Sequence, residues 1–131
     1  MKIIATRLKD GQDLFKEIKR VAAEHNIQAG VILSAVGGLH ESTIRVPVFD
    51  QKVKYIHPSN LEINGLHGTV SAGGSHLHMV VSDLDGKVWG GHLKDGCIVR
   101  NTCELVIGIL PDVRFTREPD SDTGFDEIVI K

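Results

Sequence analysis

After residue 28, the chain consists mainly of short β-prone segments separated by turns rich in glycine, aspartate and serine. The clearest segments read AGVILSAVGGL (29–39), STIRVPV (42–48), LEINGLHGTVSA (61–72), HLHMVVSDL (76–84), KVWGGHL (87–93) and CIVRNTCELVIGIL (97–110). Short strands at this spacing, joined by tight turns, predict a largely antiparallel sheet. No other feature constrains the fold as much, because strands joined by short turns pair in opposite directions.

Glycine and proline residues predict where several strands end. The segment 29–39 should end as a buried strand at Gly37-Gly38, and Pro47 suggests an edge strand or a strand end for 42–48. Residues 50–60, DQKVKYIHPSN, are a polar excursion broken by Pro58. The tail from Thr116 onward should be mostly turn, with a last strand over residues 127–130.

The N-terminal part adds one helix to this sheet. IIATRL (3–8) is β-prone and ends at the turn Lys9-Asp10-Gly11. Between Gln12 and Asn26, the apolar residues recur at the spacing of one helical stripe: Leu14, Phe15, Ile18, Val21 and Ala22. Asp10 or Asp13 could accept hydrogen bonds from the first helical amides. We therefore predict a single α+β domain over residues 1–131, a mostly antiparallel sheet with one main amphipathic helix near the N-terminus.

Composition narrows the class of protein. The formal net charge is −2, and lysines and arginines are scattered without a basic run or an AT-hook. A duplex binder usually presents a basic face, so DNA binding has weak support. No apolar run reaches the roughly 18 residues of a membrane span, and the N-terminus does not resemble a signal peptide. We expect a cytoplasmic protein without a membrane anchor, whose Cys97 and Cys103 are free buried thiols.

The stretch GGSHLHMVVSDLDGKVWGGHL, residues 73–93, holds three of the seven histidines. Side chains alternate along a strand, so His76 and His78 share one face. The turn decides where His92 points. A two-residue Asp85-Gly86 loop would place His92 opposite Met79, on the other face.

A type I turn over DLDG (83–86), with Gly86 as a left-handed bulge residue, would instead place His92 opposite His78. Aspartate at the first and glycine at the fourth turn position favour this register. It also collects the apolar side chains on one face: Leu77, Met79, Val81, Trp89 and Leu93. Cross-strand partners lie about 5 Å apart at Cβ and diagonal neighbours about 7 to 8 Å apart, within reach of a shared ion.

Three neutral imidazoles on one hairpin suit a divalent transition metal, with zinc as the default ion. Three protein ligands leave a fourth position for water or substrate, as catalytic zinc sites do. The alternative is that His76, His78 and His92 are surface or interface histidines on a solvated face.

Other polar residues are weaker candidates. Glu62 lies between Leu61 and Ile63 and faces away from the core, either as an exposed carboxylate or as a partner of an imidazole. Arg45 could hold an anionic substrate or could simply be solvated. His67 is treated as structural unless the fold brings it to the site.

The chain resembles the PPC (plants and prokaryotes conserved) family over nearly its whole length. The resemblance rests on LKDGQDLFKEI, SAVGGL, LEINGLHGTVS, the histidine stretch and FTREPDSDTGFDEIVI, in that order. Two departures are Leu61, where the family usually has a bulky aromatic residue, and His40, where a smaller residue is usual.

The resemblance implies an α+β domain that assembles as a homotrimer, and it carries the family's label of predicted DNA binding. Plant relatives contact DNA through AT-hooks, which this chain lacks. The fold is also similar to that of acetolactate decarboxylase, whose zinc is held by an HxH pair and a third histidine. His76, His78 and His92 match that arrangement.

Two functions follow as hypotheses. The first is a homotrimeric assembly module with a three-histidine divalent-metal site, associated with DNA through partners if at all. The second is a zinc-dependent lyase or hydrolase acting on a small carbonyl or acidic substrate, with Glu62 and Arg45 as the available polar groups. Direct duplex binding is a third, against which the composition argues.

Overall fold

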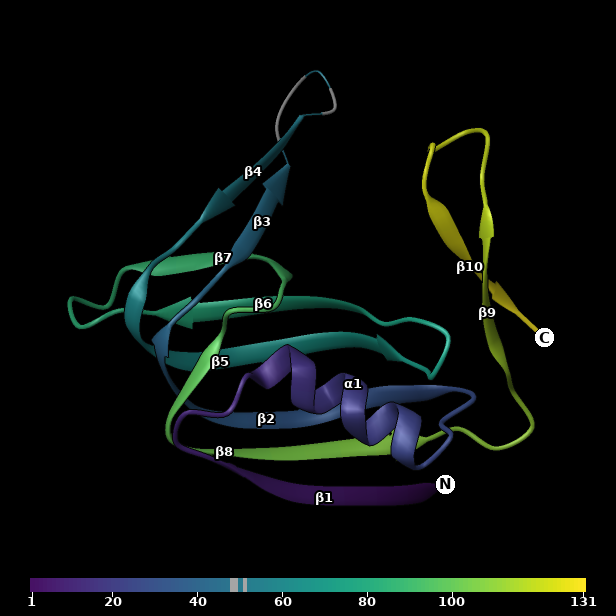
Figure 1. Cartoon of the computed structure of the whole chain (residues 1–131), viewed down its shortest axis with the longest axis horizontal. Helices are drawn as coiled ribbons and strands as arrows, with labels where there is room; N and C mark the ends of the chain where they lie inside the picture. Colours follow the sequence, from purple (N-terminus) through teal and green to yellow (C-terminus); the bar gives the residue numbers. More distant parts are fainter. Residues whose placement is uncertain (48–49, 51) are drawn as a thin grey trace.

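The computed structural model of the protein describes residues 1–47, 50 and 52–131 (Figure 1). Val48 of the predicted segment 42–48 and Gln51 of the polar excursion lie outside these residues. Within the described residues, one helix and ten strands follow in the order β1 (Lys2–Lys9), α1 (Leu14–Glu24), β2 (Gly30–Glu41), β3 (Ile44–Pro47), β4 (Val53–Ile56), β5 (Ser59–Val70), β6 (His76–Ser82), β7 (Val88–Leu93), β8 (Ile98–Ile109), β9 (Phe115–Pro119) and β10 (Asp126–Ile130).

Eight of the strands form one sheet in the order β1-β8-β2-β5-β6-β7-β3-β4, and every pair within it is antiparallel. β9 and β10 form a separate hairpin beside it (Figure 1). The α+β fold with one N-terminal helix is thereby confirmed. No helix of the described residues is long and apolar enough to cross a membrane.

The core lies between α1 and one face of the large sheet. α1 buries the apolar stripe that its sequence predicts, and this stripe packs with apolar side chains from β5, β6 and β8. Cys97 and Cys103 are free and buried within the same cluster, as expected. Burial raises the pKa of both thiols to about 11. No helix of the described part of the chain covers the opposite face of the sheet (Figure 1).

Three predicted boundaries are wrong, each for a physical reason. β2 does not end at Gly37-Gly38 but continues to Glu41, with a register shift against β8 at these glycines. A Cβ at Gly37 would lie 2.1 Å from the Thr102 carbonyl oxygen, so glycine allows the strands to approach closely at the irregularity.

Residues 53–56 of the polar excursion form β4, and residues 115–119, which include the start of the tail, form β9. β4 pairs with β3 at the edge of the sheet and exposes Val53 and Tyr55. Neither strand has one face fully buried, so neither shows the alternation that identifies strands in a sequence.

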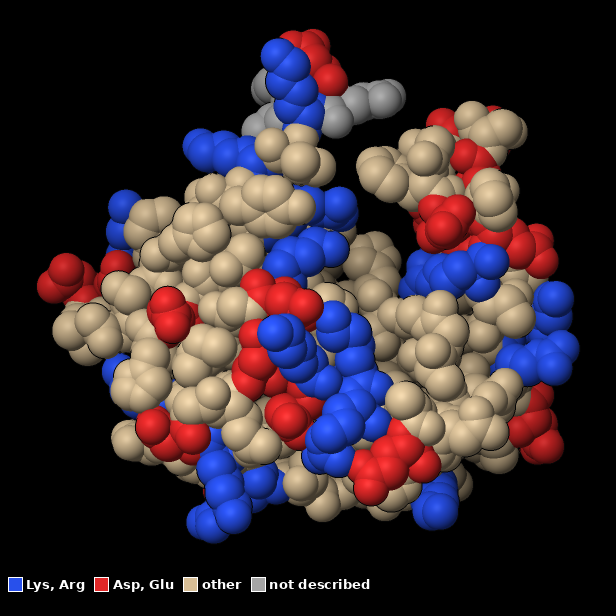
Figure 2. All heavy atoms as spheres, viewed as in Figure 1, with Lys and Arg blue, Asp and Glu red and all other residues tan. Residues whose placement is uncertain are grey.

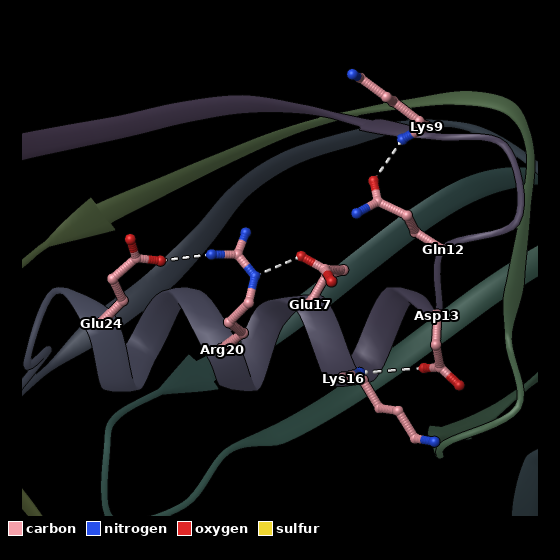
Figure 3. Close-up of polar contacts among 7 residues, drawn as sticks. All are labelled: Lys9, Gln12, Asp13, Lys16, Glu17, Arg20 and Glu24. Carbon is pink, nitrogen blue, oxygen red and sulfur yellow. Dashed lines mark hydrogen bonds and ion pairs between the residues drawn. The ribbon is translucent and has the colours of Figure 1, made fainter.

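Asp13, rather than Asp10, caps α1 (Figure 3). Its Oδ1 accepts a hydrogen bond from the Lys16 amide at 3.1 Å, and its Oδ2 accepts one from the Gly96 amide at 2.7 Å. On the exposed side of the helix, Arg20 forms ion pairs with Glu17 and Glu24 (Figure 3). Asp13 therefore ties the start of α1 to the loop before β8.

Replacing Asp13 by alanine is expected to lower the free energy of unfolding by about 1 to 2 kcal/mol, because the helix loses its cap and the Gly96 amide loses its acceptor. Urea denaturation measures this. Asp95→Ala is the matched control, because it removes an exposed carboxylate that pairs with Lys19 and should cost less than about 1 kcal/mol. Equal losses in the two variants would contradict the capping role.

Candidate metal centre

The turn between β6 and β7 determines how the two strands of this hairpin pair. The Gly86 amide donates to the Asp83 carbonyl at 3.0 Å, and Gly86 is left-handed with φ +77°. The Asp83 carboxylate accepts from the amides of Asp85 and Lys87, both at 2.9 Å. These bonds are those expected of a type I turn with a bulge. His78 consequently pairs with His92, which confirms the predicted register.

This register separates the two faces of the hairpin as expected. Leu77, Met79, Val81 and Leu93 are buried in the core, and Trp89 packs against it. The three histidines project from the other face, His76 and His78 exposed and His92 half-buried.

The three imidazoles meet. The ring centroids of His78 and His92 are 4.5 Å apart, those of His76 and His78 5.0 Å, and those of His76 and His92 5.2 Å. One ligand nitrogen from each ring lies within 4.8 Å of the other two. Three nitrogen donors on adjacent rigid strands are a set that fits zinc and similar divalent ions.

The surroundings favour the neutral, ligand form of two of these imidazoles. Partial desolvation lowers the pKa of His76, with the neighbouring His78 as the next cause. Desolvation, followed by the charge of Arg45, lowers the pKa of His92 to about 4. Neutral imidazole is the form that coordinates a metal ion.

The structure brings Arg45 and His67 to the cluster but not Glu62. Arg45 on β3 pairs with His92, and His67 on β5 pairs with His78. Glu62 lies opposite Ser82 at the other end of the β5–β6 pair, where its Oε1 accepts a hydrogen bond from Arg100 at 3.0 Å. It lines neither cavity at the histidines.

Two residues near the histidines come from the tail that was expected to be mostly turn. Arg117 on β9 donates to the Thr69 hydroxyl at 3.4 Å, and Glu127 lies on the paired strand β10. Their charges act on His76 in opposite directions. No local spacing could have placed them there, although the resemblance described above included the motif FTREPDSDTGFDEIVI.

A cavity of about 550 Å³ opens beside His76 and His92. Strands β3 and β4 and the hairpin β9–β10 contribute to its lining, which is Arg45, Val46, Pro47, Lys52, Val53, Gly74, Ser75, His76, His92, Arg117, Phe125, Asp126 and Glu127. A smaller hollow of about 310 Å³ lies against His67, His76 and His78. Together the cluster and the larger cavity form a site with nitrogen donors at one end and charged and apolar groups at the other.

On the face seen in Figure 2, lysines and arginines form a short central group that is bordered by acidic residues. Lysines and arginines there are interspersed with acidic and uncharged residues. This distribution agrees with the scattered basic residues of the sequence and provides no continuous basic surface on that face.

Curated relatives match the whole chain but are much longer. Two proteins named "Bifunctional protein GlmU", from Synechococcus sp. strains JA-2-3B'a(2-13) and JA-3-3Ab, are 43% and 41% identical over 131 residues. The match covers all of this chain and 20% and 21% of those proteins, so the chain spans about a fifth of their length.

Solved structures share the fold over nearly the full chain. A hypothetical protein from Salmonella enterica superposes with a TM-score of 0.91 at 35% identity, covering 99% of this chain and 93% of that one. A protein from Archaeoglobus fulgidus, named as metal-containing, has a TM-score of 0.81 at 29% identity, covering 98% and 94%.

A more distant likeness concerns the fold alone. The α-acetolactate decarboxylase from Bacillus subtilis has a TM-score of 0.50 at 16% identity, covering 80% of this chain and 51% of that one. The sequence profile of the Plants and Prokaryotes Conserved domain matches residues 1–111. Since that match includes the three histidines and all eight strands of the large sheet, the chain belongs to the Plants and Prokaryotes Conserved (PPC) family.

Proposed function

We propose that this chain is a homotrimeric assembly domain that holds a divalent metal ion, zinc by its donor set, on His76, His78 and His92. The convergence of three imidazole nitrogens within 4.8 Å carries this proposal. The metal-containing Archaeoglobus relative, at 29% identity, supports it. Three protein ligands leave room for a fourth, which a water molecule or a partner group would supply.

The helix-free face of the sheet supports self-assembly. Four large apolar side chains are exposed there: Ile3 by 48%, Leu33 by 47%, Val36 by 57% and Val80 by 38%. Ile3, Leu33 and Val36 lie on β1 and β2, which flank β8, and Val80 extends the surface toward His78 on β6. Exposed apolar surface of this kind favours burial against another protein surface. A second and third copy of the chain would cover it.

We assign no direct DNA contact to the chain. The net charge is −2, and duplex affinity grows with the number of phosphates that lysines and arginines neutralise. In this proposal, any association with DNA runs through partner proteins. Duplex binding by the isolated protein that falls steeply with salt would contradict this assignment.

A second candidate function is a metal-dependent lyase or hydrolase acting on a small carbonyl or acidic substrate. The cavity of about 550 Å³ beside His76 and His92 favours it, because an assembly domain does not need such a cavity. A bound divalent ion would polarise a substrate carbonyl or lower the pKa of a water molecule. Glu127 lines this cavity and Glu62 does not, so in this function Glu127 would transfer the proton.

Native mass spectrometry of the untagged protein, purified without chelator, tests assembly and metal together. We expect a complex of three chains that carries three zinc ions, one for each histidine cluster. Val36→Asp should weaken assembly by about 30-fold or more, since an unpaired buried charge costs at least about 2 kcal/mol.

Leu84→Asp is the matched control, because Leu84 is 79% exposed in the β6–β7 turn and should leave the trimer intact. A wild-type protein that is monomeric at micromolar concentration would contradict the assembly role. A trimer without bound metal would contradict the metal site alone.

A further inference from the structure

The residues that line the larger cavity take no part in the proposed assembly of three chains. It lies between the β3–β4 hairpin and the β9–β10 hairpin, which stand apart in Figure 1, and the surface is hollowed between them in Figure 2. His76 and His92 line it from the sheet, so one end of the cavity belongs to the proposed metal site.

Two guanidinium groups line this cavity without a carboxylate partner. Among the described residues, no Asp or Glu oxygen lies within 4.0 Å of a nitrogen of Arg45 or Arg117. The hydrogen bond that Arg117 makes to the Thr69 hydroxyl is long, at 3.4 Å. Arginine presents a planar set of donors that matches a carboxylate, so two unpaired arginines in one cavity point to an anionic ligand.

The charge balance of the lining indicates the sign of the charge that the ligand carries. Arg45, Lys52 and Arg117 contribute three positive charges, and Asp126 and Glu127 contribute two negative ones. The side chains of the lining therefore carry a net charge of about +1, and a divalent ion on His76 and His92 would make the site more positive, so the cavity complements an anionic group.

Four further residues of the lining are apolar. Val46, Pro47, Val53 and Phe125 line the cavity, and Val53 and Phe125 are each 58% exposed. Burying these side chains against a hydrocarbon chain removes apolar surface from water. The ligand that fits both the charge and the walls therefore has one anionic group and an apolar body.

We infer that the cavity binds a small monocarboxylate whose carboxylate lies between Arg45 and Arg117 and whose hydrocarbon chain lies against Val46, Val53 and Phe125. This inference deepens the proposed function, because the cavity shares His76 and His92 with the proposed metal site. It names the ligand class that the site would hold next to its metal ion.

A titration of the isotope-labelled 131-residue chain with sodium butyrate, followed by amide NMR, tests the inference. We expect saturable shifts at the amides of Arg45, His92 and Arg117. Butyrate should bind up to about 15-fold more tightly than acetate, because it buries two more methylene groups at about 0.8 kcal/mol each. Inorganic phosphate should bind more weakly than butyrate.

Arg45→Gln and Arg117→Gln should each weaken butyrate binding by about 10- to 100-fold, the effect of losing a hydrogen bond to a charged group. Arg114→Gln is the matched control, because this exposed arginine precedes β9 and does not line the cavity. Elemental analysis of the same samples should show unchanged metal content in all three variants.

The two proposals fail in different ways. Protein that contains zinc but shows no saturable butyrate shifts, or shifts that the two cavity variants leave unchanged, would overturn this inference and leave the metal site standing. Phosphate binding tighter than butyrate would overturn the monocarboxylate class. Protein without zinc that still binds butyrate through the arginines would support the inference and overturn the metal site.

Discussion

Replacing Gly68 by alanine is expected to lower the free energy of unfolding by about 3 to 5 kcal/mol, combining backbone strain with a steric clash. Gly68 lies on β5 with φ +142°, a conformation that side-chain-bearing residues rarely adopt. A Cβ there would lie 2.0 Å from the carbonyl oxygen of His76 and 3.0 Å from the Cα of Leu77. The strand that carries the histidine pair would have to move.

Gly86→Ala is the control that separates strain from clash. Gly86 also has a left-handed backbone, with φ +77°, but nothing lies within 4 Å of a Cβ placed on it. Its replacement should cost about 1 to 2 kcal/mol. Chemical denaturation of both variants gives the comparison, and similar losses would show that the close approach of β5 and β6 at Gly68 is unimportant.

Zinc is expected to raise the free energy of unfolding of metal-free protein by about 4 kcal/mol when free zinc exceeds its dissociation constant a thousandfold. A ligand that binds only the folded state stabilises that state, and the folded hairpin is what brings His76, His78 and His92 together. His76→Ala/His78→Ala should remove the effect, because His92 is then the one remaining imidazole of the cluster.

The matched control removes two histidines elsewhere. His25 at the end of α1 and His40 beside Asp10 are exposed and lie outside the cluster. His25→Ala/His40→Ala should therefore respond to zinc as the wild type does. Zinc stabilisation that persists in the cluster variant but is lost in the control would contradict the assigned site. Urea unfolding curves with and without zinc measure both.

The histidine cluster could be predicted because its geometry is local. The sequence DLDG favours one turn type, the turn fixes the register, and the register places His78 opposite His92. The helix stripe was equally local, and only the choice between Asp10 and Asp13 as its cap needed the structure. Asp10 instead accepts hydrogen bonds from the Asn101 amide and from His40.

The rest of the site depends on contacts between distant segments. Strand alternation predicted that Glu62 faces away from the core, but it could not tell how far along β5 this residue lies from the histidines. The register shift near Gly65 and the ion pair with Arg100 are properties of the assembled sheet. Arg117 and Glu127 reach the cavity only because the β9–β10 hairpin lies against the end of the sheet.

The most direct test of the metal site is an anomalous difference map at the zinc absorption edge, from crystals of protein purified without added metal. The account predicts one peak for each chain, bonded to one nitrogen from each of His76, His78 and His92 at about 2.0 to 2.1 Å. The absence of a peak there, with the three imidazoles hydrogen-bonded separately to water, would contradict it.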